Sequence, residues 1–344
     1  MPRLSHFASP PAALITALRR ARRPLLLTHL QPDGDALGSE LGLARALRAL
    51  GAAPRLLITD PAPQTLEFLD RDRSIEVYDP SRGAETARRF ADADLIVVVD
   101  TSESKRLGSL REFALKSAAP RWVIDHHVAG DLIDSAESWS VPTSPATGLL
   151  VLQVVEQLLA GWTTATHGAV LETIAEPLFV AIASDTGWFS NSATDALAFD
   201  GVARLVEWGA APEALRKRLF QSFSINRMRL EGEVLAGLRQ AAAGRILYAV
   251  VTEADRARHD IALVDLDGIV DALRAVAGAE ILILFVELSS GNYKVSIRSA
   301  GARPVFGLAA QFGGGGHANA AGCRLVGGES DVIARMLAAA ERTI

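Results

Sequence analysis

The segment Leu95–Asp100 reads LIVVVD, five apolar residues, most of them branched at Cβ, followed directly by a carboxylate. A run of this kind predicts a strand that is covered on both faces, as the strands of a parallel sheet are. Four further apolar runs of strand length occur nearby, at Pro24–Thr28, Arg55–Thr59, Ile75–Tyr78 and Trp122–Ile124. The first half of the chain therefore predicts an α/β fold built on an open parallel sheet.

Helical patterns complete this prediction. Ala36–Leu50 and Ala84–Ala91 have helical periodicity and alternate with the strands, which places helices on both faces of the sheet. From Thr147 the pattern becomes helical, over Leu149–Leu159, Ala169–Ala183, Ala196–Trp208, Pro212–Phe220 and Met228–Ala241.

The last hundred residues start a new pattern. Strand patterns lie at Ile246–Val251, Glu280–Glu287 and Tyr293–Arg298, and helical patterns at Leu266–Val276, Val305–Phe312 and Val332–Arg342. We expect an N-terminal domain over residues 1–190, a helical connector over 191–241 and a smaller C-terminal α/β domain over 242–344.

The composition excludes several classes of protein. The chain has 344 residues, is 49% hydrophobic, and has a net charge of −5 from 35 basic and 40 acidic residues. This excludes a disordered protein and argues against one that coats long nucleic acid over its whole surface. No apolar run approaches the ~18 residues that span a bilayer, so we expect no membrane partner. The single cysteine, Cys323, fits a reducing compartment, and we expect a cytoplasmic protein.

Histidine and aspartate side chains follow three of the predicted strands. They are His29, Asp33 and Asp35 after the strand Pro24–Thr28, Asp100 after the strand Leu95–Val99, and Asp125, His126 and His127 after the strand Trp122–Ile124. Asp185 follows the apolar segment Leu178–Ala183. The carboxyl ends of parallel strands form one edge of a sheet, so we expect these side chains to converge there.

Convergence of this many carboxylates is costly unless cations neutralise them. Carboxylate and imidazole ligands without a thiolate favour Mn²⁺ or Mg²⁺, with Fe²⁺, Co²⁺ or Zn²⁺ as alternatives. Two such ions, about 3.5–4 Å apart, can hold a phosphoryl group and activate water. The competing interpretation is structural: Asp33-Gly34-Asp35 is a turn, with Asp35 capping the next helix.

These motifs resemble those of the DHH phosphoesterase superfamily. The matching residues are His29, Asp33, Asp35, Asp100, Asp125, His126, His127 and Asp185, in the family's order and rough spacing. The resemblance implies that His29, Asp33 and Asp100 hold one metal ion. It implies that Asp35, Asp100, His126 and Asp185 hold a second, with Asp100 bridging the two. His127 would face the substrate phosphate or the leaving oxygen, and Asp125 would orient a neighbouring group.

The C-terminal part carries a second motif, a run of glycines over residues 313–316 followed by His317. Successive backbone N–H groups in such a run can surround an anion, although a flexible turn is the alternative. Arg298 can grip a phosphate with two hydrogen bonds, and Ser299 adds a hydroxyl donor. The pattern resembles the DHH-associated C-terminal domain. We expect Arg298, Ser299, Gly314, Gly315, Gly316 and His317 to bind substrate, together with Arg106 from the loop after Asp100, for which an ordinary surface-loop position is the alternative.

The resemblance is strongest to the compact NrnA-like subgroup, whose members degrade very short RNAs and dephosphorylate 3′-phosphoadenosine 5′-phosphate (pAp). It implies a two-metal phosphoesterase with short RNA oligonucleotides or pAp as substrate, an active site in the cleft between the domains, and a homodimer as an open alternative. A phosphodiesterase of linear or cyclic dinucleotides is the second hypothesis, and a nucleotide-binding regulator without turnover is the third. Trp188 departs from the family pattern, which leaves the substrate contacts around it open.

Overall fold

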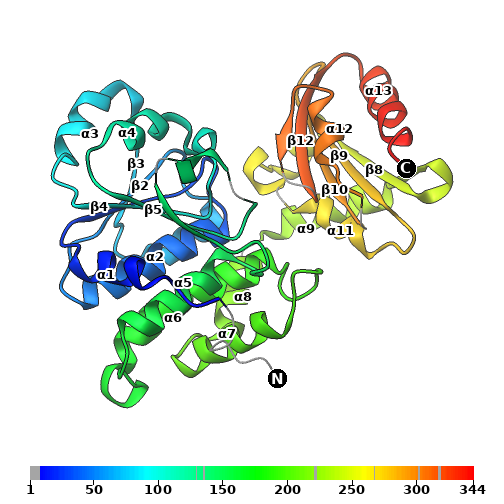
Figure 1. Cartoon of the computed structure of the whole chain (residues 1–344). Coiled ribbons are helices and arrows are strands. Elements are labelled where there is room, and N and C mark those ends of the chain that lie inside the picture. The colour runs from blue at the N-terminus through cyan, green and yellow to red at the C-terminus, as the bar shows by residue number, and fades with distance from the viewer. Residues whose placement is uncertain are drawn as a thin grey trace. The chain divides into compact units, whose positions relative to one another are not determined.

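The structure, a computed structural model, describes residues 8–128, 130–134, 136–220, 223–266, 268–300, 303–316 and 319–344 (Figure 1). The chain divides into two compact units, Met1–Ser222 and Phe223–Ile344. The segment 191–241, predicted as a connector, is shared between them. Helices α7 (Ala196–Glu207) and α8 (Pro212–Phe220) belong to the first unit, and α9 (Ile225–Ala236) belongs to the second.

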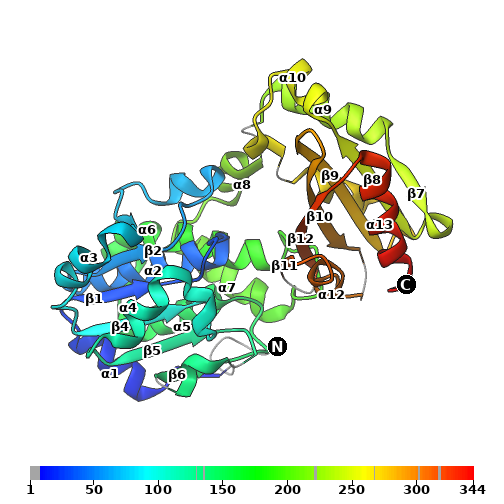
Figure 2. The same ribbon diagram turned by 90° about the horizontal axis from the view of Figure 1, so that it is seen from above.

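A sheet of parallel strands forms the centre of the first unit, as predicted. Its order is β3-β2-β1-β4-β5-β6, and every neighbouring pair is parallel. Figure 2 shows β1, β4, β5 and β6 in this order. The strands are β1 (Pro24–Leu27), β2 (Arg55–Ile58), β3 (Ile75–Val77), β4 (Leu95–Val99), β5 (Arg121–Asp125) and β6 (Glu137–Ser140).

Helices cover both faces of this sheet, which explains the uninterrupted apolar strands. Side chains alternate along β4: Val97 and Val99 lie in one buried cluster, and Ile96 and Val98 in another. The first cluster includes residues of α1 (Ala12–Arg20), α2 (Gly34–Ala49), α5 (Thr147–Leu158) and α6 (Thr164–Asp185). The second cluster lies on the opposite face of the sheet and includes Ala114 of α4 (Arg111–Lys116) and Phe90, the residue after α3 (Gly83–Arg89).

Close contact between α2 and α6 brings their ends together. A Cβ atom on Gly38 of α2 would lie 2.3 Å from the carbonyl oxygen of Pro177 in α6, so only glycine allows this approach. The contact places the start of α2, with Asp33 and Asp35, near the end of α6, with Asp185. None of the helices in the described part of the chain is both long and apolar enough to span a bilayer.

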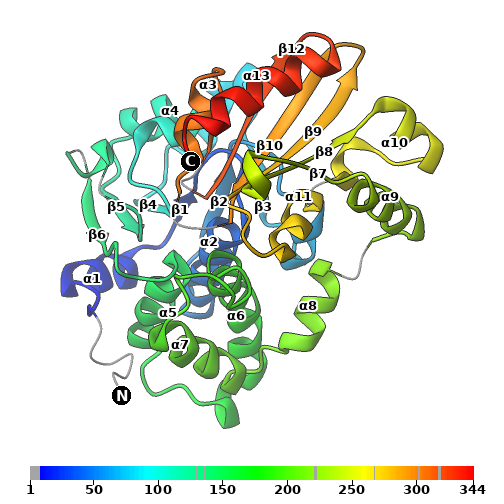
Figure 3. The same cartoon turned by 90° about the vertical axis from the view of Figure 1, so that its right-hand side faces the viewer.

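The second unit is built on a mixed sheet of order β11-β12-β10-β9-β8-β7, in which only β8 and β9 pair in parallel. Figure 3 shows α13 on one side of the strands and α9 with α11 on the other. The strands are β7 (Arg239–Ala241), β8 (Ile246–Val251), β9 (Ile281–Ser289), β10 (Asn292–Ser299), β11 (Gly315–Gly316) and β12 (Ala320–Val326). The helices are α9, α10 (Glu253–His259), α11 (Ile269–Ala272), α12 (Phe306–Ala310) and α13 (Glu329–Glu341).

Two predicted helices in this part are wrong in extent. The helix expected over Met228–Ala241 ends at Ala236, and the chain continues as β7, because these last residues pair with β8. The helix expected over Leu266–Val276 is reduced to the single turn of α11 between two 3₁₀ turns, since Gly268 has a φ of +85° and interrupts it.

Candidate metal centre

Asp100 is the central side chain of the candidate site. It follows β4 directly and is 2% exposed. Its φ of +64° lies in the left-handed region, which is costly for a residue other than glycine and tends to persist at functional sites. The backbone N–H donates to the carbonyl of Ile124 at 3.0 Å, and the Thr147 hydroxyl donates to Oδ1 at 2.9 Å. These bonds hold the carboxylate at the carboxyl edge of the sheet.

His29 faces one oxygen of this carboxylate. Its Nδ1–H donates to the carbonyl of Leu30 at 2.8 Å, which leaves the lone pair on Nε2. Nε2 lies 3.2 Å from Oδ2 of Asp100 and 3.9 Å from Oδ1 of Asp33. Burial, only partly opposed by Asp33, lowers the pKa of His29 and favours the neutral ring that a metal ligand needs. The ligand atoms of His29, Asp33 and Asp100 lie within 4.8 Å of one another.

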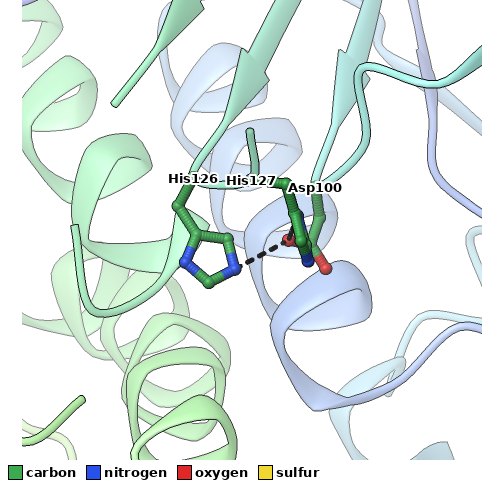
Figure 4. A group of neighbouring side chains, drawn as sticks. All are labelled: Asp100, His126 and His127. Atoms are coloured by element: carbon green, nitrogen blue, oxygen red, sulfur yellow. Dashed lines mark ion pairs between the residues drawn. The ribbon is translucent and has the colours of Figure 1, made fainter. Parts of the chain in front are cut away.

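His126 faces the other oxygen of Asp100. Figure 4 shows Asp100 with the rings of His126 and His127, which follow the neighbouring strand β5. The Nε2 atom of His126 lies 3.7 Å from Oδ1 of Asp100, 3.8 Å from Oδ2 of Asp35 and 3.0 Å from Oδ2 of Asp185. Its other nitrogen, Nδ1, lies 3.2 Å from the carbonyl oxygen of Ser144. The ligand atoms of Asp35, His126 and Asp185 also lie within 4.8 Å of one another.

Asp35 is completely buried and is held by the first turn of α5. The backbone N–H groups of Thr147 and Gly148 donate to its two oxygens at 2.7 and 2.8 Å. A Cβ atom on Gly148 would lie 2.4 Å from the Cβ of Ala181, so glycine is required here. The helix cap is Asp33, not Asp35: Oδ1 of Asp33 accepts from the backbone of Asp35 and Ala36. The alternative role of Asp35 as a cap is therefore wrong.

The chemistry of this cluster fits divalent cations. Burial and the neighbouring carboxylates raise the pKa values of Asp35 and Asp100 well above the ordinary range. Burial disfavours protonation of His126, yet Asp185, Asp35 and Asp100 together raise its pKa to about 10. Among the described residues, Nε2 of His126 has no hydrogen-bond partner although three carboxylates surround it. A cation between these groups would satisfy this nitrogen and stabilise the ionised carboxylates.

His127 is oriented by Asp125 and lies at the edge of the cluster. Its Nδ1 lies 2.8 Å from Oδ1 of Asp125 and 3.8 Å from Oδ1 of Asp100. Burial raises the pKa of Asp125, but the hydrogen bonds from His127 outweigh it, so the net pKa of Asp125 is lowered. Asp125 thus positions His127 rather than facing the other acidic groups. Since the His127 ring is a third exposed, it is accessible to a substrate.

The segment after Asp185 is a strained turn. Gly187, Trp188 and Phe189 all have positive φ values, of 56°, 54° and 64°. The Asn191 amide donates to the backbone carbonyl of Asp185 at 2.8 Å and holds the end of α6. The Trp188 ring packs edge-on against Phe220, with centroids 5.1 Å apart, so its described contacts are with an aromatic cluster of the first unit.

Arg106 lies close to the same edge of the sheet. Its backbone carbonyl accepts a hydrogen bond from the N–H of Leu30 at 2.7 Å. Its charge is near enough to His29 to contribute to the lowering of that residue's pKa. The structure thus brings together seven of the candidate residues of the first unit around Asp100, with Arg106 adjacent to them.

The candidate phosphate-binding residues lie in the second unit. Arg298, at the end of β10, donates from Nε to Asp271 of α11 at 3.2 Å. Ser299 is buried, and its backbone N–H donates to the carbonyl of Asn319. Gly315 and Gly316 form the short strand β11, paired with Gly322 and Ala321, so this part of the glycine run is a strand. A Cβ on Gly314 would lie 2.1 Å from the carbonyl oxygen of Gly322. His317 lies outside the described residues.

Thr147 supports the candidate site and was not predicted from the sequence. It is buried, its N–H binds Asp35, and its hydroxyl binds Asp100, so one residue supports both halves of the cluster. The sequence signal is the pair Thr147-Gly148 directly before the apolar run Leu149–Leu152.

Comparisons with known proteins agree with this fold. Residues 25–182 match the DHH family, N-terminal domain, and residues 243–344 match the DHHA1 domain. The chain is 30% identical to the bifunctional oligoribonuclease and PAP phosphatase NrnA of Thermus thermophilus, over 91% of this chain and 88% of that protein. It is 26% identical to the NrnA of Bacillus subtilis, over 88% of each.

A solved structure has the same fold across the chain. The exopolyphosphatase-related protein from Bacteroides fragilis superposes with a TM-score of 0.86, at 23% identity, covering 96% of this chain and 95% of that one. The chain belongs to the DHH family, with a DHHA1 domain after the DHH domain. The predicted family is confirmed, and the relatives named NrnA are of the predicted class, phosphoric ester hydrolases.

Proposed function

We propose that this chain is a metal-dependent phosphoesterase that hydrolyses di- to pentanucleotide RNA to mononucleotides and pAp to AMP. One observation carries the metal assignment: the two oxygens of Asp100 face different imidazoles, His29 at 3.2 Å and His126 at 3.7 Å. His29 shares a group of ligand atoms with Asp33 and Asp100, and His126 belongs to two others, one with Asp100 and His127 and one with Asp35 and Asp185. A carboxylate shared in this way is the arrangement expected for two bound cations.

The residues of the two groups divide between the two cations. His29, Asp33 and Asp100 would hold the first, and Asp35, Asp100, His126 and Asp185 would hold the second. Two divalent cations, Mn²⁺ before Mg²⁺, Fe²⁺ or Co²⁺, would stabilise charge on the phosphoryl oxygens and lower the pKa of water. The chain's own contribution is to hold the ligands rigidly, through Thr147 and the first turn of α5.

Further residues are assigned to the substrate. His127 would donate a hydrogen bond to the phosphate or to the leaving oxygen, because Asp125 fixes its ring. Arg298 and Ser299, with Gly314–Gly316 and His317, would bind the phosphate-bearing end of the substrate. The roles follow the two units: the first supplies hydrolysis and the second supplies substrate binding. The names of the NrnA relatives support the two substrates. We further propose a cytoplasmic location.

A substrate panel tests this function. The purified chain is incubated with Mn²⁺ and pAp, linear di- to pentaribonucleotides, linear and cyclic dinucleotide messengers, or bis-p-nitrophenyl phosphate, and the products are resolved by length. We expect mononucleotides from the short RNAs, AMP from pAp, and no turnover in EDTA. Preferred cleavage of the dinucleotide messengers would favour the second hypothesis. Binding of these compounds without turnover of any ester would favour the third hypothesis, a nucleotide-binding regulator.

A further inference from the structure

A carboxylate from α11, that of Asp271, fixes the guanidinium of Arg298. The Nε–H of Arg298 donates to Oδ1 of Asp271 at 3.2 Å, and Nη1 donates to the backbone carbonyl of Ile297, also at 3.2 Å. Within the part of the chain that the structure describes, Nη2 has no hydrogen-bond partner. The edge formed by Nη1 and Nη2 therefore keeps N–H groups with which an arginine can bind a phosphate through two hydrogen bonds.

A second arginine donates to the same carboxylate oxygen. Arg274 lies three residues after Asp271, and its Nε–H donates to Oδ1 of Asp271 at 3.0 Å. Its Nη1 donates to the backbone carbonyl of Ser299 at 2.6 Å. Because Ser299 follows Arg298 directly, these bonds form a closed ring that runs from the end of β10 to α11 and back. The ring restricts the position of Asp271 and, through it, the direction of the Arg298 side chain.

The partial exposure of these side chains argues against a role in folding alone. Arg298 is 24% exposed, Asp271 42% and Arg274 41%. Ion pairs with this exposure add little to the stability of a fold. In addition, a carboxylate beside the proposed phosphate ligand repels a bound phosphate. Asp271 therefore weakens binding through its charge, and the structure shows one compensating effect, the orientation of Arg298.

We propose that Asp271 is a positioning residue of the proposed phosphate site, a proposal that rests on the function proposed above. Its Oδ1 atom holds the Nε edge of Arg298, so that Nη1 and Nη2 meet the phosphate-bearing end of the substrate. A free arginine side chain loses rotamer freedom when it binds, and Asp271 removes part of this loss before the substrate arrives. Asp271 does not touch the substrate itself.

The geometry allows the charge and the hydrogen bonds of Asp271 to be separated. Both arginines donate to Oδ1, and no described residue donates to Oδ2. An asparagine has nearly the same shape, and its single carbonyl oxygen can accept both bonds. Asp271→Asn thus removes the charge and keeps the acceptor, whereas Asp271→Ala removes both.

The test compares Asp271→Asn and Asp271→Ala, each alone and combined with Arg298→Ala. Asp331→Ala is the matched control, because Asp331 is an exposed carboxylate that pairs with Arg335 of α13 at 3.1 Å. With Mn²⁺, KM and kcat are measured for pAp, a diribonucleotide and bis-p-nitrophenyl phosphate. Binding of a fluorescently labelled diribonucleotide is measured in EDTA, and thermal unfolding verifies that each variant is folded.

We expect KM for pAp and the dinucleotide to be about fivefold higher in Asp271→Ala than in Asp271→Asn, with similar kcat. Both variants lack the same charge, so this difference reports the oxygen that accepts from Arg298. Relative to the wild type, Asp271→Asn should lower these KM values about twofold, because a repelling charge is removed.

The combined variants show whether Asp271 acts through Arg298. In the Arg298→Ala background, Asp271→Ala and Asp271→Asn should have equal KM values, because the side chain that they position is absent. For bis-p-nitrophenyl phosphate, Asp271→Ala and Asp271→Asn should have the same KM. Asp331→Ala should match the wild type on all three esters.

Two results would overturn the proposal: equal KM values for Asp271→Ala and Asp271→Asn, or a difference between them that persists in the Arg298→Ala background. The proposed function fails separately. If the chain hydrolyses none of these esters but Asp271→Ala binds the dinucleotide in EDTA more weakly than Asp271→Asn does, Asp271 positions Arg298 in a nucleotide-binding protein without that activity. A wild-type chain that neither binds nor hydrolyses these compounds would overturn both proposals.

Discussion

Replacing Asp100 by asparagine should change stability in opposite directions with and without metal. Asparagine has the same shape, tolerates the positive φ of this position, and can still accept from the Thr147 hydroxyl. The substitution therefore removes charge with little change in geometry. Burial and neighbouring carboxylates raise the pKa of Asp100, so its ionised form costs stability at any pH above the unfolded value. Each unit of such a shift corresponds to about 1.4 kcal/mol.

Bound metal reverses the sign of the stability change that Asp100→Asn causes. Free Mn²⁺ at 100 times its Kd stabilises the folded state by about 2.7 kcal/mol. For a unit of roughly 200 residues this raises Tm by about 5–10 °C. Because Asp100 contributes to both groups of ligands, Asp100→Asn should lose at least half of this increase. In EDTA at pH 8 the same variant should unfold at a higher temperature than the wild type.

Thermal unfolding with and without Mn²⁺, combined with calorimetric titration, measures both effects. The stoichiometry should fall from two ions to one or none, and hydrolysis should be abolished. Asp92→Asn is the control, since Asp92 is an exposed carboxylate just before β4, at the other end of the same strand. An Mn²⁺-induced increase in Tm that is equal in Asp100→Asn and the wild type would refute the shared-ligand assignment.

Three further predictions follow from the same geometry. Thr147→Val should keep the backbone hydrogen bond to Asp35 but remove the hydroxyl bond to Asp100, and should lower kcat about tenfold. Thr147→Ser, which keeps the hydroxyl, should have the wild-type kcat, and an unchanged kcat in Thr147→Val would contradict the role of this bond. Arg298→Ala should lower kcat/KM for dinucleotides and pAp by the equivalent of about 1.5–3 kcal/mol, and kcat/KM for bis-p-nitrophenyl phosphate much less, without changing the Mn²⁺ affinity. Equal losses on all these esters would place Arg298 in the catalytic centre. Without metal, the neighbouring carboxylates raise the pKa of His126 to about 10, so its charge stabilises the fold fully below pH 6.5, and this stabilisation is lost as the pH rises toward 10. In EDTA, the free energy of unfolding of the wild type should therefore exceed that of His126→Gln most at pH 6. A difference in unfolding free energy that does not change with pH would disprove the interaction of His126 with these carboxylates.

Local sequence signals were sufficient for the elements of the first unit that position the metal residues. The run Leu95–Val99 is a strand because it is apolar on both faces, and α2 matches the periodic segment Ala36–Leu50 to within two residues. The edge strand β6 was not predicted, because it has only four residues, three of them polar, and Trp139 is its one buried side chain. No strand was predicted over the glycine-containing β12, since it pairs with residues of β10 that lie between 22 and 34 positions away.

The sequence by itself determined which side chains meet at the edge of the first sheet. His29, Asp100 and His126 each lie within two residues of the end of a strand, and parallel strands end on the same edge whatever lies between them. Only the tertiary structure decided what supports and extends these groups. Thr147 reaches Asp100 and Asp35 because α5 packs beside α2, and Asp271 reaches Arg298 because α11 packs beside β10. Both contacts join residues distant along the chain, and a single strand or helix pattern carries no information on which distant partner it meets.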